Sequence, residues 1–308
     1  MTQKQTAVAG HAPIRRTTEI EEITNLYLIH PLASRLVPIF AQLHVTPNAV
    51  SIVGMLFGIL SAFAYYRYWD PRFAIAGFAL MIAWHVMDGA DGQLARYTQS
   101  YSYFGKMLDG IADHVTFAAV YAALAVTASR RHGNWVYALV AVSAVFHAIQ
   151  AASYETQRQE YEYLGWGKKP QEPPPPNNRD RGGPGGSRRL LDFLHRLFFF
   201  GLSFPSAGIN RKFRETMAEA LRNDPEKAVL VRQLYRETLA PQIRSWSVLS
   251  ANYRTLGIFI STLFKAPEYY FGFEILGFSV LLAVLIRRLN SAHEVLRSNL
   301  RLAFSGSE

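Results

Sequence analysis

The stretch from Asp88 to Asp113 reads DGADGQLARYTQSYSYFGKMLDGIAD, and it lies between two strongly apolar runs. It holds four carboxylates, at Asp88, Asp91, Asp109 and Asp113. A charged side chain at the centre of a membrane helix costs about 2.5–3.5 kcal/mol on insertion scales. Four such groups in one place need a partner that neutralises them, and a divalent cation does so directly. The stretch therefore predicts helices in a membrane that meet at a metal site.

The spacing of the aspartates predicts their geometry. Asp88 and Asp91 are three residues apart, and Asp109 and Asp113 are four apart. On a helix each pair shares one face, with Cβ atoms about 5–6 Å apart. If the two helices meet, the four carboxylates converge. Oxygen-only ligands suit hard cations such as Mg²⁺, Mn²⁺ or Ca²⁺, and the planar donor fork of Arg96 suits a phosphate.

The composition places the chain among membrane proteins. It has 308 residues, of which 50% are hydrophobic, and the apolar residues gather into long runs. The formal net charge is +9, which fits basic loops beside anionic lipid better than nucleic-acid binding, because no groove-reading motif is present. The absence of cysteine excludes disulfides, thiolate metal sites and cysteine nucleophiles.

The apolar runs predict an all-α polytopic membrane protein with six transmembrane helices. An amphipathic segment over 20–43, interrupted by Pro31 and Pro38, precedes them and is typical of a helix in the membrane interface. The expected spans are Ala49–Tyr66, Phe73–Met87, Phe104–Val126, Trp135–Tyr154, Ser247–Phe264 and Tyr269–Ile286.

Composition divides the chain into four parts. We expect a disordered N-terminus over 1–18, and the interfacial helix with spans one to four and the catalytic motif over 19–155. A cytosolic insertion over 156–246 holds the flexible linker Pro173–Gly186, an aromatic interfacial helix over 188–204 and a polar helical stretch over 211–240. Spans five and six and the tail occupy 247–308.

Lysine and arginine counts predict the orientation. The N-terminus, the insertion and the tail are all basic, and with six spans they lie on one side, which we expect to be the cytosol. The aspartates then open at the cytosolic ends of spans two and three. A smaller number of basic residues lie on the opposite side, contrary to the rule that basic residues favour cytosolic loops. They are Arg67, Arg72, Arg130, Arg131 and Lys265.

The motif Asp88-x2-Asp91-Gly92-x2-Ala95-Arg96-x8-Gly105-x3-Asp109-x3-Asp113 resembles the complete signature of the CDP-alcohol phosphotransferase family, also called CDP-alcohol phosphatidyltransferases. The resemblance covers about 29–154 well and the last two spans loosely, and it does not extend to the insertion. It implies an enzyme of phospholipid synthesis, expected in a bacterial inner membrane. A CDP-alcohol, often CDP-diacylglycerol, would donate its substituted phosphate to an acceptor hydroxyl, with release of CMP.

The resemblance also implies roles for individual residues. Two Mg²⁺ or Mn²⁺ ions would be held by Asp88, Asp91, Asp109 and Asp113, and Asp113 would also act as general base toward the acceptor hydroxyl. Gly92, Ala95 and Gly105 would leave room for the cytidine of the substrate. Arg96 would contact phosphate or brace the aspartates. Thr46 and Asn48 would contact the substrate or only cap the first span. Family members often form homodimers, which the sequence neither supports nor excludes.

Two other functions compete with this interpretation. An intramembrane prenyltransferase also holds a diphosphate through Mg²⁺ on aspartate clusters, and release of pyrophosphate rather than CMP would identify it. A divalent-cation transporter would want carboxylates near the bilayer midplane, whereas these lie at one edge. His85 and His147 are expected to be helix-packing residues.

The acceptor alcohol stays open. A phosphate-bearing acceptor would need additional basic residues, for which Arg158 and Arg254 are candidates. A choline-like acceptor would need an aromatic cage. The candidate residues for such a cage are Tyr154, Tyr161, Tyr163 and Trp166.

Overall fold

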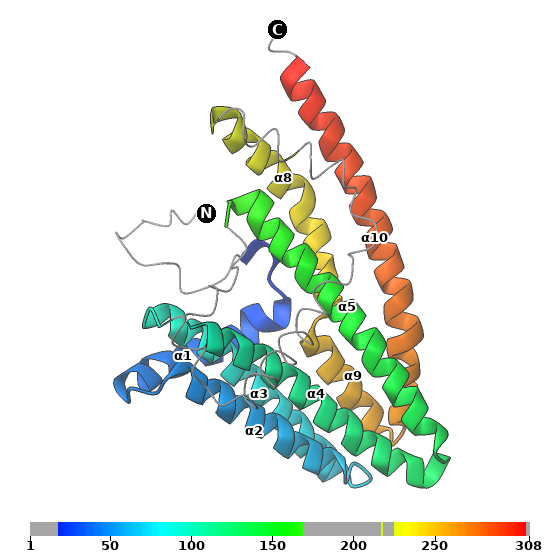
Figure 1. Cartoon of the computed structure of the whole chain (residues 1–308). Coiled ribbons are helices and arrows are strands. Elements are labelled where there is room, and N and C mark those ends of the chain that lie inside the picture. The colour runs from blue at the N-terminus through cyan, green and yellow to red at the C-terminus, as the bar shows by residue number, and fades with distance from the viewer. Residues whose placement is uncertain (1–17, 101, 169–216, 218–224, 306–308) are drawn as a thin grey trace, which may run out of the picture.

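The computed structural model describes residues 18–100, 102–168, 217 and 225–305, and within these ranges it holds helices and no strand (Figure 1). The α-helices are α1 His30–Gln42, α2 Pro47–Tyr65, α3 Pro71–Tyr97, α4 Tyr103–His132, α5 Trp135–Trp166, α8 Pro225–Trp246, α9 Ala251–Leu263 and α10 Pro267–Ser305. Short helical turns complete the described residues: η1 Thr18–Ile20, the π-helical η2 Asn25–Ile29, which continues into α1, and η4 Ser247–Leu249. The predicted all-α fold is confirmed for this part of the chain.

Five of these helices are long and apolar enough to cross a membrane: α2, α3, α4, α5 and α10. The predicted fifth span corresponds to α9, which has only 13 residues. At 1.5 Å per residue it is about 20 Å long, whereas the hydrocarbon core is about 30 Å thick. The predicted count of six spans is therefore not confirmed.

Local sequence signals set the starts of the membrane helices that carry the motif. Thr46 accepts a hydrogen bond from the Ala49 amide at 3.3 Å, and Pro47 occupies the first turn of α2. Asp70 caps α3 in the same way through the Arg72 amide, at 2.9 Å. Ser102 begins α4, and the predicted break between the two aspartate helices lies between Tyr97 and that residue.

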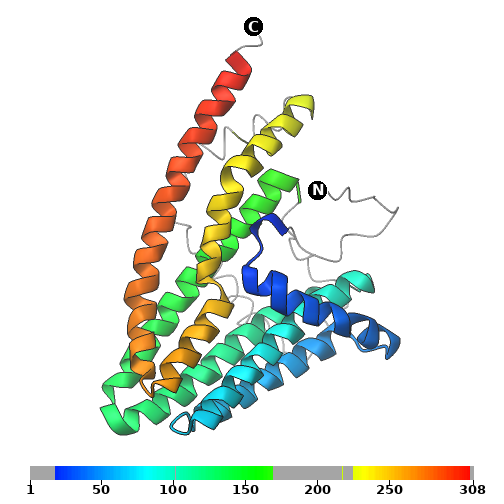
Figure 2. The ribbon, with the colours of Figure 1, turned by 180° about the vertical axis from the view of Figure 1, so that it is seen from behind.

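The helices form two groups that meet at one end and diverge toward the other (Figures 1 and 2). Helices α3 and α4 both pack on α2, and α1 lies against α3. Helices α5, α8 and α10 form the second group, with α8 packed on both α5 and α10. Helix α9 packs on α3 and on α10, so it joins the two groups.

Helices α2 and α4 approach closely at Gly58. A Cβ atom there would lie 2.2 Å from Thr116 Oγ1, so the contact leaves no room for a side chain. The opposite side of α2 is a stripe of apolar side chains that are between 43% and 69% exposed: Ile52, Val53, Leu56, Leu60 and Phe63. Such a stripe suits contact with lipid, which supports an integral membrane protein.

The other predicted segments are either outside the described residues or differ in extent or location. The linker Pro173–Gly186, the aromatic segment 188–204 and residues 1–17 lie outside the described residues. The N-terminal amphipathic segment is helical and contains Pro38 inside α1, while its place in the membrane interface stays a prediction. Helix α5 continues to Trp166, twelve residues beyond the expected end of span four.

Candidate metal-binding site

Three of the four aspartates come together where α3 and α4 face each other. Asp88 and Asp91 on α3 and Asp109 on α4 each offer a carboxylate oxygen, and these oxygens lie within 4.8 Å of one another. Asp91 is buried and the other two are half-buried. The local i, i+3 spacing places the first pair on one face, and the approach of α4 brings in the third carboxylate.

Asp113 lies one turn beyond Asp109 on α4 and is half-buried. It is outside the group of three, but its charge interacts with Asp88, as do the charges of Asp109 and Asp91. Four like charges oppose one another here, and all the donor atoms are carboxylate oxygens. This donor set fits a divalent hard cation such as Mg²⁺ or Mn²⁺; the identity and number of ions stay predictions.

Ser51 contributes a contact that the sequence analysis missed. Its hydroxyl donates a short hydrogen bond to Asp91 Oδ2, and both side chains are buried. A hydrogen bond of this kind fixes the orientation of a ligating carboxylate. The sequence does hold a signal, because Ser51 follows Asn48 by three residues and so shares its face of α2.

Asn48 and Gly105 meet where α2 and α4 begin. A Cβ at position 105 would lie 2.7 Å from Asn48 Oδ1 and 2.9 Å from Ser102 Oγ. Gly105 therefore lets the Asn48 amide sit directly on the first turn of α4. The Thr46 side chain caps α2, as described above, and this hydrogen bond is exposed.

Gly92, Ala95 and Arg96 lie on α3 just beyond Asp91. A Cβ at Gly92 would lie 3.6 Å from Arg96 Nη1, so the guanidinium folds back over this glycine, next to Asp91 in the chain. Arg96 and Ala95 are both half-buried. The arrangement places one cationic fork beside the carboxylates, while the contacts of these residues with substrate stay predictions.

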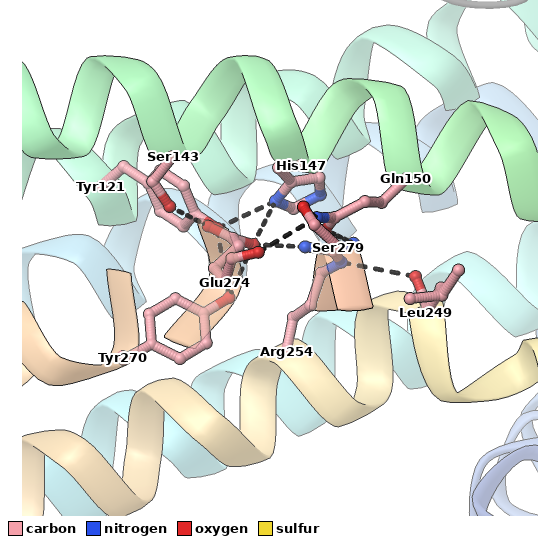
Figure 3. Close-up of polar contacts among 9 residues, drawn as sticks. All are labelled: Tyr121, Ser143, His147, Gln150, Leu249, Arg254, Tyr270, Glu274 and Ser279. Carbon is pink, nitrogen blue, oxygen red and sulfur yellow. Dashed lines mark hydrogen bonds and ion pairs between the residues drawn. The ribbon is translucent and has the colours of Figure 1, made fainter. Parts of the chain in front are cut away.

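A second polar cluster, which we call the Glu274 cluster, is buried between α4, α5, α9 and α10 (Figure 3). The Glu274 carboxylate forms an ion pair with Arg254, and neither residue is exposed to solvent. Glu274 also accepts hydrogen bonds from Tyr121 at 2.6 Å, from Ser143 and from Tyr270 at 3.0 Å. Glu274 was not predicted as a site residue, although a carboxylate inside the apolar run 269–286 is a visible signal.

The Glu274 cluster includes two more side chains from α5. Gln150 Oε1 accepts from Arg254 Nη2 at 3.0 Å, and His147 Nδ1 lies 3.3 Å from a Glu274 oxygen. Thr255, the residue after Arg254 on α9, has its Oγ1 2.9 Å from His85 Nε2. His85 lies on α3, one turn before Asp88. Both histidines thus join helices, as predicted, and α9 connects the cluster to the aspartate helix.

The residues considered for the acceptor are engaged with other protein groups. Arg158 pairs with Glu155 at 2.6 Å and Glu162 at 3.4 Å, and Arg254 pairs with Glu274. Of the four aromatic residues considered for a cage, Tyr161 packs on Tyr235, and Trp166 has the Arg236 guanidinium over its ring at 4.2 Å.

Comparison with known proteins gives the same answer as the motif. Residues 44–171 match the family profile described as CDP-alcohol phosphatidyltransferase. The chain is 30% identical over 118 residues to the bifunctional IPC transferase and DIPP synthase of Aquifex aeolicus, which covers 38% of this chain and 26% of that protein. It is 34% identical over 80 residues to the archaetidylinositol phosphate synthase of Pyrococcus horikoshii, which covers 26% of this chain and 40% of that protein.

The chain thus spans well under half the length of these two relatives, and no solved structure matches it. The matched residues nevertheless contain all four aspartates and the whole of α2, α3, α4 and α5. The segment that carries the aspartate group therefore matches the CDP-alcohol phosphatidyltransferase family and is similar to these two enzymes.

Proposed function

We propose that this protein transfers a phosphatidyl group from CDP-diacylglycerol to the hydroxyl of a polar alcohol, with release of CMP, in phospholipid synthesis. The observation that carries the proposal is the group formed by Asp88, Asp91 and Asp109, whose carboxylate oxygens lie within 4.8 Å of one another on two membrane helices. A diphosphate is the charged group that a metal-carboxylate site of this kind binds.

Asp88, Asp91 and Asp109 would hold Mg²⁺ or Mn²⁺, and Asp113 would complete the ligand set for two ions. Bound there, the ions would neutralise the diphosphate oxygens and the developing charge on the leaving CMP. Ser51 keeps the Asp91 carboxylate in one orientation through its hydrogen bond.

The remaining residues position the two substrates. Asp113 takes the proton of the acceptor hydroxyl. At the same time the hydroxyl oxygen forms the new bond to phosphorus, and the bond from phosphorus to the CMP oxygen breaks. Arg96 donates to a phosphate oxygen from its place beside Gly92. Asn48, held against Gly105, contacts the cytidine at the open ends of α2 and α4.

The ion pairs of Arg158 and Arg254 bear on whether the acceptor alcohol carries a phosphate. Arg158 and Arg254 are the basic residues considered for an acceptor phosphate, and each is already paired with glutamate. We therefore expect an acceptor without a phosphate of its own. The name archaetidylinositol phosphate synthase makes inositol and inositol phosphate the first acceptors to compare.

We also propose that the aspartates face the cytosol from a bacterial inner membrane. The support is the positive charge of the N-terminal region and of the insertion, which the orientation rule places on the cytosolic side. A homodimer through the membrane helices stays a proposal from the family resemblance alone.

The experiment is CMP release by purified protein with Mg²⁺ or Mn²⁺, CDP-diacylglycerol and single acceptor alcohols. Asp109→Asn should abolish CMP release while the protein stays folded in detergent, because it removes one carboxylate of the metal-binding group. Asp70→Asn is the matched control, since it makes the same change at the other end of α3, where asparagine also caps a helix. Full activity of Asp109→Asn would refute the metal assignment, and pyrophosphate release from a prenyl diphosphate would favour the prenyltransferase.

A further inference from the structure

A basic cavity lies at the end of the molecule opposite to the aspartates. It has a volume of about 580 Å³ and is formed by the α2–α3 loop and the last turns of α4. Along α3 and α4 it is roughly 25–30 Å from Asp88 and Asp109, at 1.5 Å per residue. We call it the arginine cavity; its lining residues are Tyr66, Arg67, Trp69, Asp70, Phe73, Thr127, Arg130 and Arg131.

The three arginines of this cavity are held by aromatic rings. The guanidinium carbons of Arg130 and Arg131 lie 5.0 Å and 5.1 Å from the ring centroids of Tyr66 and Trp69, and Arg130 also donates to the Tyr66 hydroxyl. Arg67 lies over Phe73 at 5.5 Å. Stacking of this kind fixes a guanidinium while leaving its N–H groups available to an anion.

The charge of the arginine cavity is not balanced by its own residues. Asp70 is the single carboxylate in the lining, and its Oδ1 accepts from the Arg72 amide. Within the described part of the chain, no carboxylate lies within 4.0 Å of a guanidinium nitrogen of Arg67, Arg130 or Arg131. The lining therefore carries two positive charges in excess, at the membrane end where the orientation rule disfavours arginine; the nearby Glu268 lies outside the lining and 3.4 Å from His132.

From this geometry we propose that the arginine cavity binds the phosphate group of an anionic phospholipid. Three planar donor forks around a cavity of this size match a phosphodiester. Phe63, one turn before Tyr66, is 69% exposed and ends the apolar stripe of α2, so an acyl chain has a surface to follow from the headgroup. The site is separate from the proposed transfer site and does not depend on the assignment of that reaction.

The test is a titration of the purified protein in detergent with a short-chain phosphatidylglycerol, with lipid retention measured by native mass spectrometry. Inorganic phosphate and a short-chain phosphatidylcholine are the parallel probes. The variant Arg67→Gln/Arg130→Gln/Arg131→Gln removes the donor forks. Arg131→Gln and Arg72→Gln form the matched single-charge pair, because each removes one positive charge from the same end of the molecule but only Arg131 lines the cavity.

We expect the triple variant to bind phosphatidylglycerol about tenfold more weakly than the unaltered protein, and Arg72→Gln to bind it unchanged. If the triple variant does not fold, Arg131→Gln is compared with Arg72→Gln, since Arg131 is exposed and packs on the Trp69 ring. Competition by inorganic phosphate at the same concentrations would identify free phosphate as the source of the bound group. Equal binding by all variants, or an equal loss in Arg72→Gln, would overturn the proposal.

Discussion

Gly58→Ala should loosen the contact on which the aspartate site depends. The new Cβ would lie 2.2 Å from Thr116 Oγ1, 2.6 Å from its Cγ2 and 2.8 Å from its Cβ. No rotamer of Thr116 relieves the clash, because its own Cβ is too close. Helices α2 and α4 must therefore move apart, and overpacking of this kind costs about 1–3 kcal/mol.

The same movement should reduce activity. Helix α2 carries Ser51 and Asn48, and α4 carries Asp109, so separating these helices displaces groups of one site. A misplacement of about 1 Å can lower a rate by roughly 100-fold, and a shift of a few tenths of an ångström should cost about tenfold. The measurements are thermal unfolding in detergent and CMP release.

Two further variants make the prediction specific. Gly272→Ala in α10 meets no atom within 4 Å, so it should be neutral or stabilise by about 0.5–1 kcal/mol. Thr116→Gly added to Gly58→Ala removes all three clashing atoms and should restore much of the activity. If Gly58→Ala alone behaves like Gly272→Ala, the close approach of α2 and α4 is not what positions the site.

Ser51→Ala should weaken Mn²⁺ binding by about 10–100-fold, because Asp91 loses the donor that orients it; an unchanged Mn²⁺ dependence of CMP release would contradict this. Arg254→Met should destabilise the fold by about 3–5 kcal/mol, because it leaves the Glu274 carboxylate buried without its cation. Adding Glu274→Gln, which removes the charge but keeps an oxygen that accepts from Tyr121 and Tyr270, should recover part of that stability in the same unfolding assay. A double variant no more stable than Arg254→Met would argue against the ion pair. Burial raises the pKa of Glu22 above its usual value of 4.5. The folded state therefore holds this proton more tightly, so stability should fall as the pH rises through the folded-state pKa, and Glu22→Gln should lack this component of the pH slope.

The aspartate site was predictable from the sequence because its geometry is largely local. Spacings of three and four residues place Asp88 with Asp91 and Asp109 with Asp113 on helix faces whatever the rest of the chain does. Ser51 was not found because its contact depends on how α2 lies against α3. That register comes from side-chain packing over the whole bundle, which no single segment encodes.

The predicted fifth span was not confirmed, and the physical reason can be located. The run Ser247–Phe264 is apolar enough to suggest a span, but Ser250 is extended, with ψ of 167°, so the helix begins only at Ala251. The run also contains Arg254, which the cost of a charge in lipid should have weighed against. Its partner Glu274 stands in a different apolar run, and neither run alone reveals the pair.

The Arg254–Glu274 pair has a consequence for how the protein is made. Arg254 reaches the membrane twenty residues before Glu274 as the chain emerges from the ribosome, and α9 is too short to hold the arginine there by itself. We therefore expect the two helices to enter the bilayer together as a hairpin that turns at Lys265. A chain that stops before Glu274 should leave α9 at the membrane surface, where quality-control proteases can reach it.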